Sequence, residues 1–192
     1  MRRCFALIAL ALSLAGCVSP SSGTDVGRFS MAWDHRPEAA HWTISTMSAV
    51  AAEDPVLAAR IPSDIDTWCP GYEDGTVSER RAFWTGLISA VARYESSWNP
   101  RAAGGGGAYI GLMQISPRSA RNYGCDANSA AELKDGSANL QCAVEMVAYH
   151  VASDDMVAGG GNKGIGRDWM PLRDSKKRKA LAAWTREQPY CQ

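Results

Sequence analysis

The sequence predicts a mainly α-helical domain. In the stretch that leads to Glu95, apolar residues recur every three or four positions, which is the period of a helix with one buried face. These residues are Phe83, Trp84, Leu87, Ile88, Val91 and Ala92. A second stretch, beginning near residue 137, has the same period at Leu140, Val144, Val147 and Val151. Two such helices predict a helical core, and a small β-element is expected near the glycine-rich run that lies between them.

The composition is that of a globular protein, with 46% hydrophobic residues and a formal net charge of zero. A balanced charge gives no electrostatic reason to expect nucleic acid as a partner. No internal repeat or coiled-coil period is present. The histidines are scattered without the spacing of metal ligands, so neither a metal nor an organic cofactor is implied.

Residues 1–16 are predicted to be a secretion signal. Arg2 and Arg3 precede an apolar run that is too short to span a bilayer. The tetrapeptide Leu14-Ala15-Gly16-Cys17 resembles the lipobox of bacterial lipoproteins, which implies cleavage before Cys17 and lipidation of that cysteine. The expected location is the periplasm, with a lipid anchor in a membrane. The residue after Cys17 is not an aspartate, which favours the outer membrane. The alternative is a plain signal peptide with an incidental cysteine.

Three segments follow the signal. Residues 17–30 are predicted to be the lipidated cysteine and a flexible tether, because they are rich in Ser, Gly and Pro. Residues 31–75 are expected to form a helical extension packed on the core, and residues 76–192 the core itself. Within the extension, a helix is expected from Pro37 to Glu53, and a loop from Ile61 to Gly75.

Four cysteines remain in the exported part: Cys69, Cys125, Cys142 and Cys191. An even number in an exported domain predicts two disulfides, for which three connectivities exist. We favour Cys125–Cys142, which closes a short segment, together with Cys69–Cys191, which ties the end of the domain to its front.

Glu95 is expected in the last turn of the first core helix. That helix begins at Thr76, where Glu79 three residues later forms a capping-box pattern, and it ends near Glu95 because Pro100 disfavours helical geometry just before it. Burial and the negative end of the helix dipole both raise the pKa of a carboxyl group at this position. A glutamate that is protonated near neutral pH is suited to act as a general acid.

The sequence around Glu95 resembles the catalytic signature of the soluble lytic transglycosylases, which have a goose-lysozyme-like core and cleave peptidoglycan. The resemblance rests on Glu95-Ser96 with Asn99-Pro100, then on residues 111–115, Gly-Leu-Met-Gln-Ile, with Pro117 following. It spans about Ser78 to Trp184, and it is specific over Glu95 to Pro117. The implied fold is the lysozyme-like superfamily, with residues 76–192 as the catalytic core.

The resemblance implies cleavage of the bond between N-acetylmuramic acid and N-acetylglucosamine without water, with Glu95 as acid and then base. No other carboxylate lies in a motif, so a mechanism with one carboxylate is the economical one. The residues expected to contact substrate are Ser96, Tyr109, Gly111, Met113, Gln114, Asn139 and Trp184. For Asn139, a role in holding the site together and a role as a helix cap both stay open.

Trp184 is the clearest departure from the family pattern, because Trp184-Thr185 stands where the family has tyrosine and asparagine. The family tyrosine contacts the catalytic glutamate through its hydroxyl, whereas an indole can only donate. Tyr190 or Tyr149 could supply a hydroxyl, or the contact could be absent. Two alternatives therefore remain open: a goose-type lysozyme that uses water, and a peptidoglycan-binding lipoprotein without catalysis.

Two further segments are predicted to lack a catalytic role. The four glycines from Gly104 to Gly107 are expected to form a mobile loop, because such a run does not favour a regular element. The basic residues Arg173 and Lys176 to Lys179 are expected to be a solvated helix face. A helix is expected from about Pro117 to Tyr123, because proline is favoured in a first helical turn.

Overall fold

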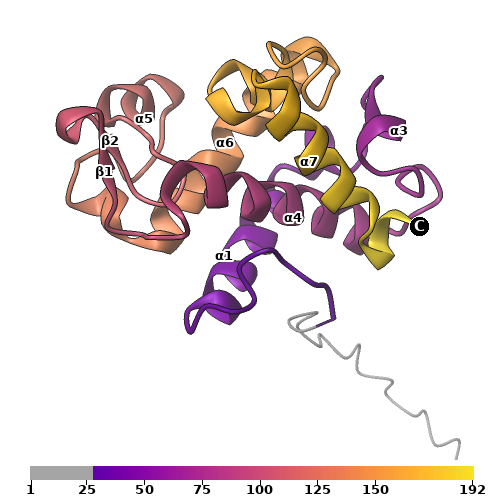
Figure 1. The fold of residues 1–192 in the computed structure, drawn as a ribbon, viewed down its shortest axis with the longest axis horizontal. Helices are drawn as coiled ribbons and strands as arrows, with labels where there is room; N and C mark the ends of the chain where they lie inside the picture. The colour runs from indigo at the N-terminus through magenta and orange to yellow at the C-terminus, as the bar shows by residue number, and fades with distance from the viewer. Residues whose placement is uncertain (1–27) are drawn as a thin grey trace, which may run out of the picture.

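The computed structural model describes residues 28–192, which fold into a mainly helical domain (Figure 1). The predicted signal, Cys17 and residues 17–27 of the predicted tether lie outside the described residues. The α-helices are α1 Ala39–Ala52, α2 Asp54–Leu57, α3 Ile65–Trp68, α4 Val77–Ser96, α5 Pro117–Tyr123, α6 Gly136–Asp154 and α7 Ser175–Arg186. Short 3-10 turns lie at Gly105–Gly107, Glu132–Lys134, Gly164–Arg167, Met170–Leu172 and Pro189–Cys191. The prediction of a mainly helical fold is confirmed.

Helix α4 runs through the middle of the domain (Figure 1). Thr76 and Glu79 form the predicted capping box, in which each residue satisfies a backbone N–H of the other. Every residue from Ala82 to Ala92 is buried, because α1, α2 and α7 cover different faces of the helix. Burial on all sides fixes the end of α4 in place, and Glu95 lies at that end.

A small antiparallel hairpin follows α4. Its strands are β1 Ala103–Gly104 and β2 Tyr109–Ile110, with Ala103 paired to Ile110. The prediction of a mobile loop at Gly104 to Gly107 is therefore wrong in part, since these glycines belong to a hydrogen-bonded hairpin. Gly105, Gly106 and Gly107 all have positive φ, a conformation that glycine adopts without strain, and this allows the tight turn. The expected small β-element is present.

The predicted extension, residues 31–75, shares one hydrophobic core with α4 and α6. Trp33, Trp42 and Trp68 are buried in the same hydrophobic cluster as the residues of α4 and α6. The predicted tether also ends too late, because Phe29 is 9% exposed and packs edge-on against Tyr190 at 5.8 Å between ring centroids. The predicted loop of residues 61–75 contains helix α3, which is tied down by the Asp64 carboxylate. That carboxylate accepts hydrogen bonds from the backbone N–H groups of residues 157–159.

Two disulfides join the four cysteines, Cys69–Cys191 and Cys125–Cys142. This is the pairing that the sequence analysis favours. The first closes a separation of 122 residues and the second a separation of 17. Because a long closed loop restricts the unfolded chain more, the first is expected to contribute more to stability.

Replacing Cys69 and Cys191 together by serine is expected to lower the free energy of unfolding by about 2–5 kcal/mol. Denaturant unfolding monitored by tryptophan fluorescence measures the change. The double variant Cys125→Ser with Cys142→Ser provides the comparison, and an equal or larger loss in that variant would contradict the ranking.

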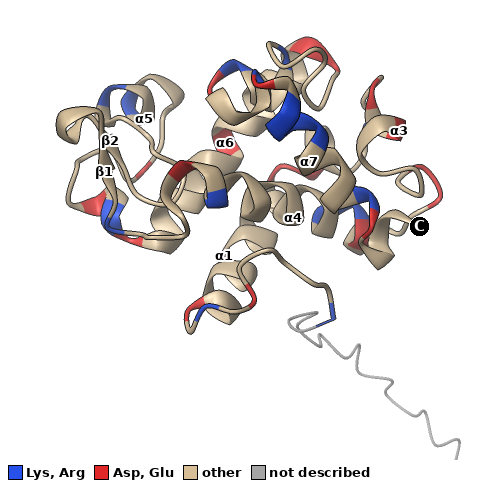
Figure 2. Ribbon diagram, viewed as in Figure 1, with Lys and Arg blue, Asp and Glu red and all other residues tan. Residues whose placement is uncertain are grey.

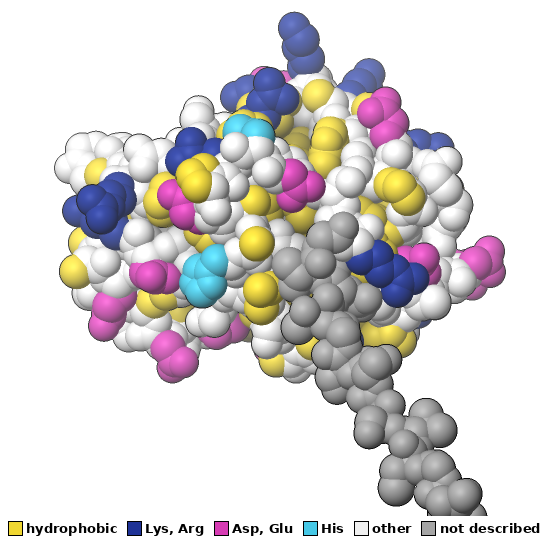
Figure 3. All heavy atoms as spheres, turned by 90° about the horizontal axis from the view of Figure 1, so that it is seen from below, with side chains coloured by type: hydrophobic (Ala, Val, Ile, Leu, Met, Phe, Trp, Pro, Cys, Tyr) yellow, Lys and Arg dark blue, Asp and Glu magenta, His cyan; other side chains and the backbone are white. Residues whose placement is uncertain are grey.

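The surface carries charges of both signs. On the face seen from below, acidic, basic and hydrophobic side chains are interspersed (Figure 3). In the part of the chain that the structure describes, no helix combines the length and apolar character needed to cross a membrane.

Candidate active site

Glu95 lies in the last turn of α4, as the sequence predicts. The helix ends at Ser96, and both Ser97 and Trp98 then have positive φ, at 52° and 57°. Ser97 and Trp98 donate backbone hydrogen bonds to the carbonyls of Arg93 and Ala92, which closes the helix end. Two successive non-glycine residues in this conformation are uncommon, and such strain is concentrated at functional sites.

A hollow of about 410 Å³ contains the Glu95 side chain, and the other residues that line it are Tyr109, Gln114, Asp168, Met170 and Arg173. Tyr109 and Gln114 are predicted site residues, so the structure brings three of the predicted residues to one place. Asp168, Met170 and Arg173 form the opposite wall, and the sequence analysis missed them as site residues.

The pKa of Glu95 is raised to about 7. Burial is the main cause, since it disfavours the charged carboxylate, and the nearby Lys177 ammonium opposes it by favouring the charged form. Among the described residues, no donor forms a hydrogen bond with the Glu95 carboxyl group. The group is therefore able to hold or release a proton near neutral pH, which a general acid and base requires.

Gln114 is held by a tight turn. Ile110 and Ile115 exchange both backbone hydrogen bonds, and the four residues between them close the turn. Gln114 has φ 48°, and its Nε2 donates to the carbonyl of Gly111 at 2.9 Å. Its Oε1 lies against Gly104, where a Cβ atom would approach it to 2.3 Å. The amide is thus fixed at the edge of the hollow by its turn and by the hairpin.

Asn139 is buried beneath this turn and is 0% exposed. Its Oδ1 accepts from the backbone N–H of Met113 at 2.8 Å, and its Nδ2 donates to the carbonyls of Ile110 and Leu133, each at 3.0 Å. The prediction that Asn139 contacts substrate is wrong, because its amide is engaged within the protein. Of the two roles left open, it holds the site together, while the cap of α6 is Asp135.

Met113 and Gly111 are also structural. Met113 is 0% exposed, so the prediction that its side chain contacts substrate is wrong. Gly111 has φ 80°, and a Cβ atom there would lie 2.3 Å from both the carbonyl of Leu133 and Nδ2 of Asn139. Glycine is required at this position by the backbone and by the close packing of the asparagine.

Neither tyrosine considered as the source of a hydroxyl for Glu95 contacts it, and Ser96 and Trp184 also lie outside the lining of the catalytic pocket. Ser96 donates its hydroxyl back to the carbonyl of Ala92 at 3.2 Å. Trp184 lines a different hollow, between α4 and α7, and not the pocket of Glu95. Tyr190 donates to the carbonyl of Ser30, and Tyr149 packs against Tyr123. The family tyrosine therefore has no replacement among these residues.

Asp168 belongs to a hydrogen-bonded cluster on the opposite wall. Its Oδ2 accepts from the hydroxyl of Tyr123 at 3.0 Å and lies 2.8 Å from Nε2 of His150, while the Tyr123 oxygen is 2.7 Å from that nitrogen. Burial and the Asp168 carboxylate raise the pKa of the Tyr123 hydroxyl, so it remains protonated. Among the described residues, Asp168 Oδ1 has no hydrogen-bond partner.

The opposite wall is anchored to the Gln114 turn through Trp169, whose indole N–H donates to the carbonyl of Met113 at 2.8 Å. Arg173 is held by the carbonyls of Gly166 and Arg167. The run Asp168-Trp169 in the sequence offers no catalytic motif, and contacts between distant segments, including that of Trp169 with Met113, bring Asp168 and Arg173 to Glu95.

A second hollow of about 480 Å³ adjoins the first and shares Glu95, Met170 and Arg173 with it. It is also lined by Tyr94 and Lys177, among others. The prediction that Arg173 and Lys176 to Lys179 are only a solvated face is therefore wrong for Arg173 and Lys177. Figure 2 shows the basic residues gathered where α7 begins, next to the end of α4.

The site offers acid–base chemistry. Within residues 28–192, no group of three or more His, Cys, Asp or Glu side chains is placed to hold a metal ion. What the pocket presents is a half-buried carboxyl group with a pKa of about 7, a fixed amide, a tyrosine and a basic wall. These groups suit the binding of a polar polymer and the protonation of a leaving oxygen.

Residues 76–183, more than half of the chain, match the family model described as the Transglycosylase SLT domain. The solved structures similar to the chain include wild-type form 2 of Bd0314 DslA, with 26% identity and a TM-score of 0.76 over 85% of this chain and 98% of that chain. Two Glu-to-Gln mutants of Bd0314 DslA match with 26% identity and TM-scores of 0.76 and 0.75, over 84% of this chain and 97% of theirs. Curated protein sequences give no significant match. The chain therefore belongs to the Transglycosylase SLT domain family and is a lytic transglycosylase-type enzyme that acts on peptidoglycan.

Proposed function

We propose that the protein cleaves the β-1,4 bond between N-acetylmuramic acid and N-acetylglucosamine without consuming water, and leaves 1,6-anhydro-muramoyl ends. The observation that carries the proposal is the Glu95 carboxyl group, which lies in the pocket with a pKa of about 7 and without a hydrogen-bond partner among the described residues. Such a group is able to give up a proton in one step and to accept one in the next.

In the first step, Glu95 protonates the bridging oxygen, the bond from the muramoyl anomeric carbon to that oxygen breaks, and N-acetylglucosamine leaves with a free 4-hydroxyl. The carbonyl oxygen of the muramoyl N-acetyl group bonds to the anomeric carbon and takes up the positive charge. In the second step, the Glu95 carboxylate removes the proton of the 6-hydroxyl, and its oxygen displaces the acetyl oxygen. Glu95 is again protonated, and the 1,6-anhydro ring is complete.

Gln114 and Tyr109 are proposed to bind the glycan. Gln114 is fixed by the Gly111 carbonyl and by contact with Gly104, so its position in the pocket needs no reorganisation when substrate binds. Tyr109 is 51% exposed beside it and offers a ring face and a hydroxyl to a sugar. Arg173 adds a donor group on the opposite wall.

The enzyme is further proposed to act in the periplasm as a lipoprotein, anchored through Cys17 in the outer membrane. This rests on the lipobox-like sequence at residues 14–17 and on the four cysteines that pair in two disulfides, which persist in oxidising compartments. Metabolic labelling with a radioactive fatty acid tests it, and a Cys17→Ala chain that still takes up label would overturn it.

The products of peptidoglycan digestion test the proposed reaction. Purified protein is incubated with insoluble peptidoglycan, and the released muropeptides are resolved by mass spectrometry. Anhydro-muropeptides, 18 Da lighter than the hydrolytic products by the loss of one water, support the proposal. Reducing-end muropeptides would instead identify a hydrolase. The absence of both from folded, glycan-binding protein would identify a binding lipoprotein.

Hydrolysis is the second candidate because Asp168 places another carboxylate in the pocket of Glu95. A water held by Asp168 would then attack the anomeric carbon, as in a two-carboxylate glycosidase. Under the proposed transglycosylase reaction, we expect Asp168→Asn to keep the anhydro product and to change the rate less than tenfold. A loss of a hundredfold or more, together with reducing-end products from the unsubstituted enzyme, would favour hydrolysis. Initial rates of muropeptide release provide the measurement.

A further inference from the structure

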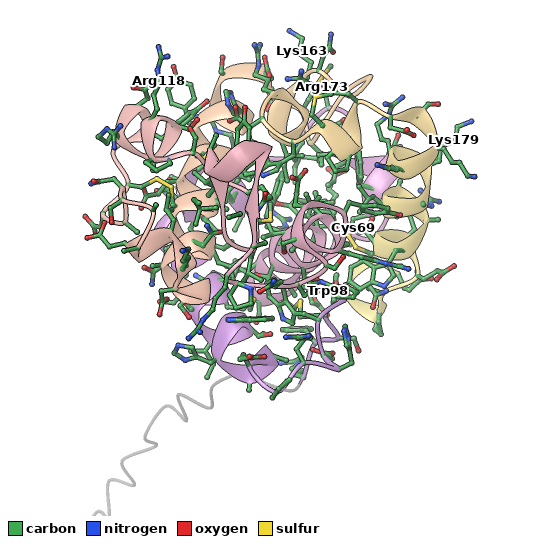
Figure 4. All side chains as sticks on the ribbon, turned by 60° about the vertical axis from the view of Figure 1, so that its left-hand side comes forward. Cys69, Trp98, Arg118, Lys163, Arg173 and Lys179 are labelled. Atoms are coloured by element: carbon green, nitrogen blue, oxygen red, sulfur yellow. A yellow bond between two sulfur atoms is a disulfide. The ribbon has the colours of Figure 1, made fainter. Side chains whose placement is uncertain are left out.

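A groove between α4 and α7 adjoins the second hollow and shares only Tyr94 with it. Its volume is about 370 Å³, and its main lining residues are Arg93, Tyr94, Trp98, Leu181, Trp184 and Glu187. Tyr94 also lines the second hollow, which includes Glu95, so this residue lies at the border between the two spaces. Figure 4 shows the labelled Arg173 and Trp98 on opposite sides of α4, with the end of the helix between them.

We propose that this groove binds the peptide stem of the glycan strand whose sugars occupy the catalytic pocket. The inference rests on the proposed function, since the stem is attached to N-acetylmuramic acid through its lactyl group. A stem peptide has polar backbone amides, apolar methyl side chains, free carboxylates, and an amine on its diamino acid.

The body of the groove is aromatic and held in place. The Trp98 indole N–H donates to the carbonyl of Ser89 at 2.8 Å, and the His35 ring packs against Trp98 at 4.5 Å between centroids. Tyr94 is 37% exposed, and Trp184 is partly buried against the core. Rigid aromatic surfaces of this kind bind a ligand with little loss of side-chain entropy.

One cation, Arg93, lines the groove, and a second, Lys177, lies in the adjoining hollow beyond Tyr94. The Arg93 guanidinium lies over the Trp98 ring at 6.0 Å from the centroid, and the Lys177 ammonium lies over the Tyr94 ring at 5.6 Å. Within the described residues, neither cation has a hydrogen bond or an ion pair. An arginine stacked on an aromatic ring keeps its fork of N–H donors directed outward, which suits a carboxylate.

Glu187 supplies the opposite charge at the C-terminal end of α7. Its carboxylate also has no hydrogen-bond or ion-pair partner among the described residues, and it lines the same groove as Arg93. An anion and a cation in the groove, with Lys177 beside it, are complementary to a peptide that has several carboxylates and an amine. An uncharged stretch of glycan would leave these groups without partners, so the stem fits the groove better than additional sugars do.

Kinetics on two substrates test the proposal: glycan strands with intact stems, and strands from which an amidase has removed the stems. Arg93→Met removes the charge and keeps the apolar stem over Trp98. We expect it to raise KM about tenfold on intact strands, with kcat unchanged, and to leave KM on stripped strands as it is. Arg118→Met is the matched control, because Arg118 is an exposed arginine on α5, away from the groove (Figure 4).

Equal KM values of the unsubstituted enzyme on both substrates would overturn the proposal. An equal rise in KM for Arg93→Met on both substrates would also overturn it, by assigning the groove to glycan. Thermal unfolding of each variant establishes that it is folded.

A binding measurement separates this inference from the proposed reaction, because it needs no turnover. Calorimetric titration of the enzyme with an isolated stem tetrapeptide is expected to show binding that weakens at least tenfold in Arg93→Met. Glu187→Gln is expected to weaken binding of the peptide whose diamino acid has a free amine. It is expected not to change binding of the peptide in which that amine is acetylated. Equal binding of the peptide by the unsubstituted enzyme, Arg93→Met and Glu187→Gln would refute the proposal that the groove binds the stem, whether or not anhydro products form.

Discussion

Glu95→Gln is expected to reduce kcat for muropeptide release by about a hundred- to ten-thousand-fold, the usual contribution of a general acid and base. Glutamine keeps the size of the side chain but neither gives nor takes up a proton. Because the Glu95 carboxyl group forms no hydrogen bond with any described residue, the substitution leaves no partner unsatisfied, and the fold is expected to be unchanged.

The rate of the same reaction is expected to fall as the pH rises. Glu95 must be protonated to start the reaction, and its pKa is about 7. Activity is therefore expected to be full below this pH and to fall as the pH rises through about 7. Since Lys177 favours the charged carboxylate, Lys177→Met is expected to move the fall to higher pH. Values of kcat/KM determined between about pH 5 and 9 provide the measurement.

Glu145→Gln is the matched control for Glu95→Gln. Glu145 is a carboxyl group on α6 whose pKa is also raised by burial, and it lies outside the catalytic pocket. Its substitution is expected to leave kcat within about twofold of the unsubstituted enzyme. Full activity of Glu95→Gln, or an equal loss in both variants, would contradict the assignment of Glu95.

Asn139→Asp is expected to be the most destabilising single change in the site. Aspartate has the shape of asparagine and still accepts from Met113 N–H, but it no longer donates to the carbonyls of Ile110 and Leu133. Each buried carbonyl left without a donor costs about 1–3 kcal/mol, so the loss in unfolding free energy is about 2–6 kcal/mol. For a domain of this size, this corresponds to a fall in Tm of roughly 5–20 °C.

Thermal unfolding followed by circular dichroism measures the effect, and Asn162→Asp is the control. Asn162 is exposed, and the structure gives its side chain no hydrogen bond among the described residues. A Tm for Asn139→Asp within about 2 °C of the control would show that the three hydrogen bonds do not hold the turn. In the residual folded protein, activity is also expected to fall, because Gln114 depends on the same turn.

The sequence predicts what depends on local pattern. The helical period, the capping box at Thr76 and the stop before Pro100 are local properties, and each places Glu95 at the end of α4. Gln114 and Tyr109 are found through the resemblance of residues 95–117 to the family signature. Disulfide pairing follows less directly, since three connectivities are compatible with the sequence.

What the sequence misses depends on packing between distant segments. Asp168 and Arg173 reach the pocket because Trp169 bonds to the carbonyl of Met113, which is 56 residues away. Conversely, Met113 and Asn139 belong to recognisable motifs, yet they face the core. A motif identifies residues that a fold requires, but it does not distinguish those that touch substrate from those that shape the backbone.

The shared hydrophobic core has a consequence for protein engineering. The family match covers residues 76–183, whereas Trp33, Trp42 and Trp68 before it and Cys191 after it are buried in the same core. A fragment cut at the family boundaries would expose this apolar surface to water. It would also lack both Cys69 and Cys191, which form the disulfide with the longer separation. A fusion protein that is to contain the folded domain therefore needs residues on both sides of the segment 76–183 that the family model matches.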